Sequence, residues 1–143
     1  MVAQTNVWNV GPVPVVAGAD LTGKEGLLVE VNNSSGTPVV VLVDDMAEAA
    51  LLLLLDGAAS GEDVYAEALQ AGKYYRGIAK GAVNPGNRLC LADPAVAADK
   101  GKLRVLPTAA GTYRCIGFAM EAKTDGQSIL FCVTGSEAVT VTG

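Results

Sequence analysis

Apolar residues in this chain fall into short runs that are separated by turn-forming residues. The runs are rich in Val, Leu and Ile, and Gly, Pro, Asn and Asp recur between them at intervals of about ten residues, which is typical of an all-β fold. We therefore predict a small barrel or sandwich of short antiparallel strands. The expected strands are Leu27–Val31, Thr37–Val43, Ala50–Leu55, Val64–Leu69, Tyr75–Lys80, Leu89–Ala92 and Leu103–Leu106.

The longest pattern, Gly111 to Thr134, predicts a β-hairpin over which the other strands close. Thr124, Asp125 and Gly126 supply the turn, because Asp caps its own backbone and Gly accepts a positive φ. Pairing Ala122 with Gln127 brings the large side chains to one face, which we expect to be buried. The facing pairs are then Met120 with Ile129, Phe118 with Phe131, and Ile116 with Val133. The other face carries mostly small residues: Cys115, Gly117, Ala119, Leu130 and Cys132.

Three turns share the pattern of a glycine followed by two polar residues and an apolar one, at Gly61, Gly86 and Gly126. We interpret each as a turn that leads into a strand. The stretch Met46–Leu55 favours a helix by residue propensity, but it is short and its five consecutive leucines show no polar face. We predict a turn or helical tip at 46–49 and a buried strand after it. The tail Ser136–Gly143 could pair as an edge strand.

The first 18 residues predict an extended, apolar arm. Pro12 and Pro14 remove backbone donors and exclude a helix, which leaves an edge strand or a polyproline-like lead-in. Trp8 in such an arm either packs onto its own barrel or lies across a neighbouring subunit, as in strand addition. We therefore divide the chain into an arm, 1–18, and a single β-barrel domain, 19–143.

Composition narrows the class of protein. The 143 residues fit one domain, and a net charge of −5 without a basic stripe argues against nucleic acid as a partner. Three cysteines, an odd number, predict buried free thiols rather than disulfides. This indicates a protein that is made in a reducing cytoplasm. The N-terminus lacks the features of a signal peptide, and the longest apolar run, Ala49–Leu55, is too short to span a bilayer. We expect no membrane association.

The sequence offers little reactive chemistry. It contains no His, no CxxC spacing and no nucleotide-binding or nucleophile-elbow motif, so we expect no enzyme activity, no cofactor and no metal. The pairs Asp44-Asp45 and Glu62-Asp63 are adjacent in sequence and point to opposite faces of a strand, so we interpret them as solvated turn charges. Tyr74-Tyr75-Arg76 and Tyr113-Arg114 combine aromatic and guanidinium groups, which suits either a protein interface or a strand end with its Tyr packed.

The order of four stretches is similar to a known family. These are Ala19–Gly26, Leu51–Val64, Gly77–Leu89 and Ile116–Ala122 before Asp125-Gly126. In order and spacing they resemble the capsid cement, or head decoration, proteins of tailed bacteriophages. The resemblance implies a small β-rich protein, often a trimer, which is made in the host cytoplasm and sits on the outside of the head. It also implies that the partner is the major capsid protein and that an N-terminal arm adds a strand to the capsid lattice.

We expect a structural virion protein that stabilises contacts between capsid subunits. Its candidate interface residues are Val7, Trp8, Val10, Val13, Val15, Tyr74, Tyr75 and Arg76. Two other classes remain open. One is a carbohydrate-binding or adhesion module on the virion surface, and the other is a hydrolase that uses isolated carboxylates such as Asp44 or Glu62.

Overall fold

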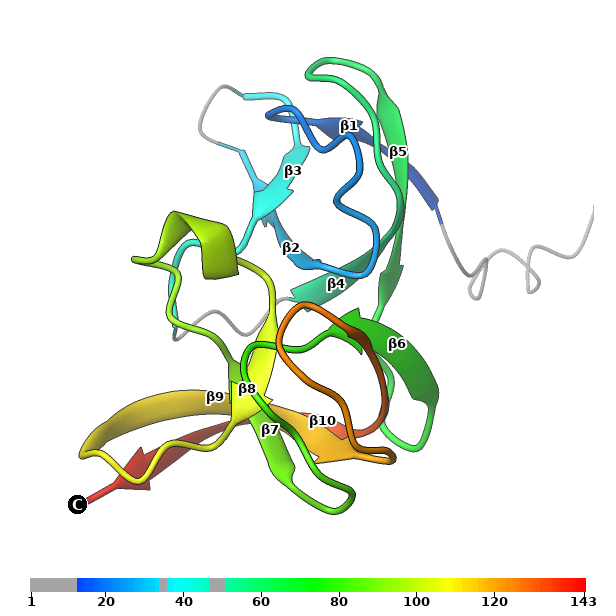
Figure 1. Cartoon of the computed structure of the whole chain (residues 1–143). Helices are drawn as coiled ribbons and strands as arrows, with labels where there is room; N and C mark the ends of the chain where they lie inside the picture. Colours follow the sequence, from blue (N-terminus) through cyan, green and yellow to red (C-terminus); the bar gives the residue numbers. More distant parts are fainter. Residues whose placement is uncertain (1–12, 34–35, 47–50) are drawn as a thin grey trace, which may run out of the picture.

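The computed structural model describes residues 13–33, 36–46 and 51–143, and in this part of the chain the fold is all-β, as predicted (Figure 1). One short 3-10 helix, Ala97–Asp99, lies between two strands. The strands are β1 (Val13–Ala17), β2 (Leu28–Asn32), β3 (Val39–Leu42), β4 (Leu51–Asp56), β5 (Asp63–Ala68), β6 (Tyr74–Ile78), β7 (Arg88–Leu91), β8 (Leu103–Val105), β9 (Gly111–Ala119) and β10 (Ser128–Val141).

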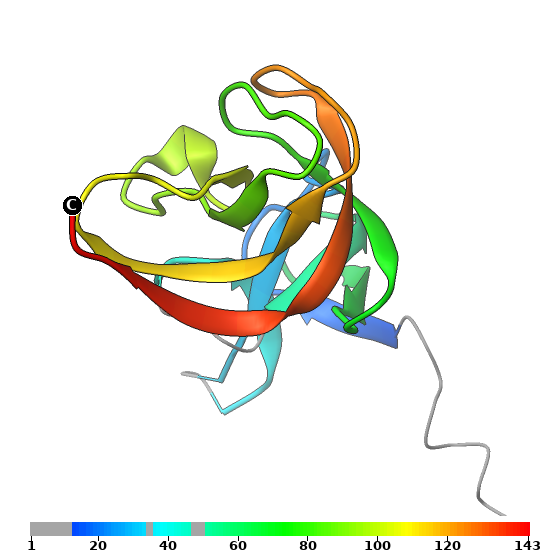
Figure 2. The ribbon, with the colours of Figure 1, turned by 90° about the horizontal axis from the view of Figure 1, so that it is seen from below.

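The strands form two consecutive units. The first five close into a barrel in the order β1-β3-β2-β4-β5, with β5 paired to β1. The last five form a curled sheet in the order β6-β10-β9-β7-β8. Figure 1 shows the barrel above the curled sheet, and Figure 2 shows the curvature of the sheet from below.

The curled sheet repeats the topology and register of the barrel. Leu54 pairs with Ala66 as Ala119 pairs with Phe131, and Leu28 pairs with Leu53 as Arg88 pairs with Phe118. The correspondence extends to the parallel pairing that joins β1 to β3. There Ala17 pairs with Val40, and in the curled sheet Ala79 forms the matching parallel bridge to Leu103. Each strand from β1 to β5 therefore has its counterpart five strands later.

The connecting loops repeat the same hydrogen bonds. The Ala17 N–H donates to Glu62 O and the Ala79 N–H to Gln127 O, both at 2.9 Å. The Leu21 N–H donates to Ala58 O, and the Val83 N–H to Lys123 O, again at 2.9 Å. The two halves therefore share one backbone plan in their loops as well as in their strands.

Seven core residues of the barrel have a buried counterpart in the curled sheet. The barrel set is Ala17, Leu21, Val29, Val40, Leu54, Val64 and Ala66. The matching set is Ala79, Val83, Leu89, Leu103, Ala119, Ile129 and Phe131. Only Ala17 and Ala79 are the same amino acid. The two cores therefore share the positions of their buried residues and their apolar character, but not their sequence.

The two halves share part of one core. Leu28, Leu51 and Leu53 point outward from the barrel, yet they are buried in the same cluster as Tyr75, Phe131 and other residues of the curled sheet. Burial of a large aliphatic side chain contributes about 1.5–3 kcal/mol. The outer face of β2 and β4 thus joins the barrel to the curled sheet.

The predicted glycine turns are confirmed, and the described chain contains three more of the same kind. Each of the six glycines has a φ between +80° and +87°, and a strand starts two residues later. The residue after each glycine donates its N–H to the carbonyl three positions earlier, at 3.0–3.2 Å. The set is Gly26, Gly61, Gly72, Gly86, Gly101 and Gly126.

The predicted register of the terminal hairpin is wrong by one residue. Phe131 pairs with Ala119, and Val133 pairs with Gly117. The Thr124–Gln127 turn is present. The residues just before it do not pair with β10, and Lys123 pairs with Val83 instead. The predicted short turn is therefore part of a wider loop. In the observed register small residues of β9 lie opposite large residues of β10, as Ala119 does opposite Phe131.

The faces of the hairpin change as a result. On β10 the side chains of Ile129, Phe131 and Val133 are buried, as predicted. Phe118 on β9 is half-buried, and Met120, just after the end of β9, is exposed, although both were expected in the core. Ile116 stays buried because the pairing of β9 shifts at this point against both neighbours.

The N-terminal boundary also differs from the prediction. Val13–Ala17 is a strand that pairs with both β3 and β5, so it completes the barrel. Residues 1–12 lie outside the described residues. At the other end, the predicted edge strand is the continuation of β10, which pairs with Gly111–Cys115 of β9.

The ambiguous leucine stretch is a strand, β4, as predicted, and Met46 lies in a turn, while 47–50 lie outside the described residues. In the described ranges no helix has the length and apolar character needed to cross a membrane.

Candidate interaction surface

Most acidic residues of the described chain are exposed. They and the cysteines make no group of three or more that could hold a metal ion, and Asp44, Asp45, Glu62 and Asp63 are all exposed. The one buried aspartate, Asp99, forms ion pairs with Lys80 at 3.4 Å and with Lys102 at 3.6 Å. This cluster fixes the β7–β8 connection beside the barrel, where the Leu28 N–H donates to Gly101 O.

The three cysteines are free and buried. Cys90 and Cys115 are cross-strand partners in β7 and β9. Burial, together with the neighbouring Cys115, raises the pKa of the Cys90 thiol to about 11. Burial also raises the pKa of Cys115. Both thiols are therefore protonated at neutral pH, which makes them poor nucleophiles.

The outer side of β6, β10 and β9 carries an apolar surface, which we call the Tyr74 face. Cys132 lies in register between Tyr74 and Phe118, and Leu130 lies between Arg76 and Met120. Tyr74 is 60% exposed and Met120 is 40% exposed. The solvent side of a sheet is ordinarily polar, so this row of apolar side chains is a candidate contact surface.

Charged residues border the Tyr74 face. Arg76 pairs with Glu121 at 3.1 Å, and Arg88 pairs with Glu137. Glu121 also accepts a hydrogen bond from the Leu130 N–H at 3.0 Å, at the point where β9 has turned away from β10. This backbone bond, helped by Arg76 and Lys123, holds the pKa of Glu121 below its usual value. The rim therefore keeps its carboxylate ionised.

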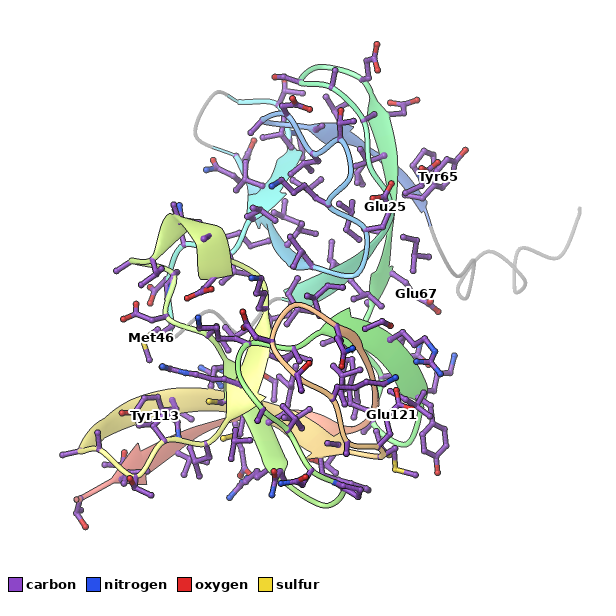
Figure 3. All side chains as sticks on the ribbon, in the orientation of Figure 1. Glu25, Met46, Tyr65, Glu67, Tyr113 and Glu121 are labelled. Atoms are coloured by element: carbon purple, nitrogen blue, oxygen red, sulfur yellow. The ribbon has the colours of Figure 1, made fainter. Side chains whose placement is uncertain are left out.

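The barrel carries a corresponding surface, which we call the Tyr65 face. Tyr65 is 45% exposed and lies between Pro14 and Asp56, the position that Leu130 takes in the curled sheet. Leu55 is 39% exposed, and Glu67 is half-buried. Figure 3 shows Tyr65 and Glu67 projecting from the outer side of β5. An aromatic side chain thus stands among carboxylates on this face.

The structure separates the predicted interface residues. Tyr74 and Arg76 are exposed on the Tyr74 face. Tyr75 is buried, because strand alternation turns it inward, where its hydroxyl donates to Ala68 O at 3.2 Å and its ring lies 6.0 Å from that of Phe131. Val13 pairs with Ala66 in the barrel, and Val15 packs against the barrel core. Val7, Trp8 and Val10 lie outside the described residues.

The second Tyr-Arg pair does not form an exposed aromatic site. Tyr113 is buried, its hydroxyl donates to Ala109 O at 3.0 Å, and the guanidinium of Arg104 lies 5.5 Å from its ring centre. Figure 3 shows Tyr113 on the curled sheet, below Met46 of the β3–β4 connection, which packs against the same cluster. Cys90, Cys115, Val139 and Val141 complete this small cluster.

Sequence reasoning missed four residues of the two faces: Leu55, Tyr65, Phe118 and Met120. Tyr65 could have been found, because it stands between Asp63 and Glu67 on the polar side of an alternating strand. Phe118 and Met120 could not, because the one-residue change of register turned them outward. Leu55 closes a run of leucines, a pattern that predicts burial.

The fold has a counterpart among solved structures. It is similar to the N base of head fiber gp8.5 of bacteriophage phi29, with a TM-score of 0.65 and 11% sequence identity, over 88% of this chain and 95% of that chain. No family model matches the sequence. A search of curated proteins also gives no match. The likeness is one of fold, and its coverage includes both halves of the chain.

Proposed function

We propose that this chain is a structural protein of a bacteriophage virion, which binds the outer surface of the head and stabilises contacts between major capsid protein subunits. The observation that carries the proposal is the fold shared with a phage head fiber base over most of both chains. The resemblance of the sequence to capsid cement proteins supports the same role independently. The proposed role is one of contact and involves no reaction.

The proposed mechanism is the burial of apolar surface and backbone pairing between this protein and the capsid subunits. Aromatic residues such as Trp are enriched among those that dominate interface energies. A modest contact is multiplied when the same protein binds many symmetry-related positions on one lattice. Binding to the assembled lattice then stabilises it by mass action.

We assign the capsid contact itself to residues 1–12. This segment contains Val7, Trp8 and Val10 and is long enough to span about 40 Å when extended. It precedes β1, whose first residue pairs with Ala66 near the end of β5. An apolar segment that leaves a barrel at a strand end suits strand addition to a partner's sheet.

The proposal is tested by binding to expanded heads of the phage that encodes the chain. Full-length protein should co-sediment with the heads and raise the temperature at which they release their DNA. Protein lacking residues 1–12 should remain folded and fail to bind. The double substitution Val7→Asp/Trp8→Asp should weaken binding as strongly, while Gln4→Asp/Thr5→Asp, with the same added charge, should weaken it much less. Full-length protein that does not bind the heads would overturn the proposal.

A carbohydrate-binding role is favoured by one observation, the exposure of Tyr65 and Tyr74 on the strands. Aromatic side chains of this kind can stack on sugar rings. Binding to a glycan array that is lost in Tyr65→Ala or Tyr74→Ala would support this second role, and an array without hits would remove it.

A further inference from the structure

The formal charge of the chain is divided between its two halves. Residues 1–72 contain one basic residue, Lys24, and ten acidic residues, a formal charge of −9. Residues 73–143 contain nine basic and five acidic residues, a formal charge of +4. Because the second half of the chain forms the curled sheet, nine of the ten basic residues lie in this sheet and its loops. The molecule is therefore electrically polar, with an acidic barrel and a basic curled sheet.

The apolar faces lie at equivalent places in the two halves. Tyr65 and Leu130 occupy the same position, as do Pro14 and Arg76. Both faces expose large side chains, and four of the six large apolar residues that are exposed in the described chain belong to them: Leu55, Tyr65, Tyr74 and Met120. Each face thus offers a strip of apolar surface on a rigid strand framework.

The rims of the two faces differ in sign. The Tyr65 face is bordered by Asp56, Asp63 and Glu67. The Tyr74 face is bordered by three cations and two carboxylates: Arg76, Arg88, Lys123, Glu121 and Glu137. Two Tyr74 faces would bring like charges together, and so would two Tyr65 faces. One face of each kind brings opposite charges around a shared apolar strip.

We propose that the Tyr65 face of one copy binds the Tyr74 face of a second copy of this chain. The contact joins two different surfaces, so each copy has one of each to offer and the assembly grows head to tail until it closes into a ring. The biological setting of this contact rests on the proposed function, but the contact itself concerns only this chain.

Two single substitutions test the contact, one on each face. Tyr65→Lys places a cation in the acidic face, and Tyr74→Glu places an anion in the basic face. Wild-type protein is expected to sediment as an oligomer, and each variant alone at the monomer mass of 14.5 kDa. A mixture of the two variants retains one intact pair of faces, so it should form species of at least twice the monomer mass, which neither variant forms alone. High salt should shift the wild type toward smaller species.

Matched controls use exposed apolar residues away from both faces. Val31→Lys in the barrel and Val96→Glu in the β7–β8 loop make the same kinds of change at positions that are 53% and 47% exposed. Both should assemble like the wild type. Thermal unfolding of all four variants shows whether each is folded. A monomeric wild type, or a mixture of folded variants that stays monomeric, would overturn the proposal.

The test is separate from that of capsid binding. Protein lacking residues 1–12 keeps both faces, so it should still form the oligomer even though it no longer binds heads. Loss of head binding with an intact oligomer, or the reverse, shows which of the two proposals has failed.

Discussion

Ala119 lies directly opposite Phe131 on neighbouring strands of the curled sheet, and both side chains are buried. At the equivalent place in the barrel, Leu54 lies opposite Ala66. The large residue has moved from one strand to the other, while each pair still combines one large and one small side chain. The two cores therefore fill the same site in two ways, as expected of closely packed interiors.

This exchange predicts a compensating pair of substitutions in the barrel. Leu54→Ala should destabilise the protein by about 2–5 kcal/mol through the cavity it leaves. Ala66→Phe should cost about 1–3 kcal/mol or more by overpacking. The double variant reproduces the Ala119–Phe131 arrangement, so its loss should be smaller than the sum by at least about 1 kcal/mol. Urea unfolding of the three variants measures this coupling, and strictly additive losses would contradict it.

The position of β1 predicts where an N-terminal truncation becomes harmful. Deletion of residues 1–12 leaves every pairing of Val13–Ala17 with β3 and β5 intact, so the unfolding free energy should change little. Deletion of residues 1–18 removes β1 and leaves both neighbours with an open edge. Circular dichroism and urea unfolding should show a folded shorter deletion and an unfolded or aggregating longer one. Equal stability of the two proteins would contradict the role of β1.

Gly117 is predicted to be intolerant of any side chain. A Cβ at this position would lie 1.9 Å from the carbonyl oxygen of Cys132, a backbone atom of the paired strand. Gly117→Ala should therefore cost about 3 kcal/mol or more, at the upper end of overpacking effects. Gly23→Ala is the control, because Gly23 has a φ of +72° but nothing within 4 Å of the added carbon. It should cost only about 1 kcal/mol, from its backbone conformation.

Acid should destabilise the fold partly through Glu121. Its pKa is held low by the Leu130 N–H first and by Arg76 and Lys123, and the Gly81 N–H lowers the pKa of Asp125 in the same way. A carboxyl group with a lowered pKa in the folded state stabilises the fold above its unfolded pKa, and this contribution is lost as the pH falls through the folded pKa. The unfolding free energy should therefore decline on acidification, and Glu121→Gln should decline less steeply.

The control for this pH profile is Glu62→Gln, at an exposed turn position. It should follow the wild-type profile in urea unfolding from neutral to acidic pH. A Glu121→Gln profile parallel to that of the wild type would show that the ionised carboxylate is not what stabilises this corner.

Sequence reasoning located the strands because local signals define them. Turn glycines such as Gly61, Gly86 and Gly126 precede strands by two residues, and runs of β-branched residues or leucines mark the strands themselves. The register of the hairpin depended on a distant residue, since Val83 pairs with Lys123 and draws the chain away from β10. No local pattern near Thr124 reports that contact.

The repeat of the fold was also invisible in the sequence. Equivalent core positions in the two halves share only their apolar character. In one case the large and small residues are even exchanged, since Leu54 faces Ala66 in the barrel and Ala119 faces Phe131 in the curled sheet. The same limit applied to the two faces. Tyr74 and Arg76 could be proposed from composition, but the outward direction of Phe118 and Met120 required the register.

The consecutive arrangement of the halves has a consequence for synthesis on the ribosome. Every strand pairing of the barrel joins residues between Val13 and Ala68, so the barrel can close before the curled sheet has been translated. Until that second unit emerges, Leu28, Leu51 and Leu53 remain in contact with water on the outside of the nascent barrel. The nascent chain thus exposes a hydrophobic patch for a time, until the second half of the same chain folds over it.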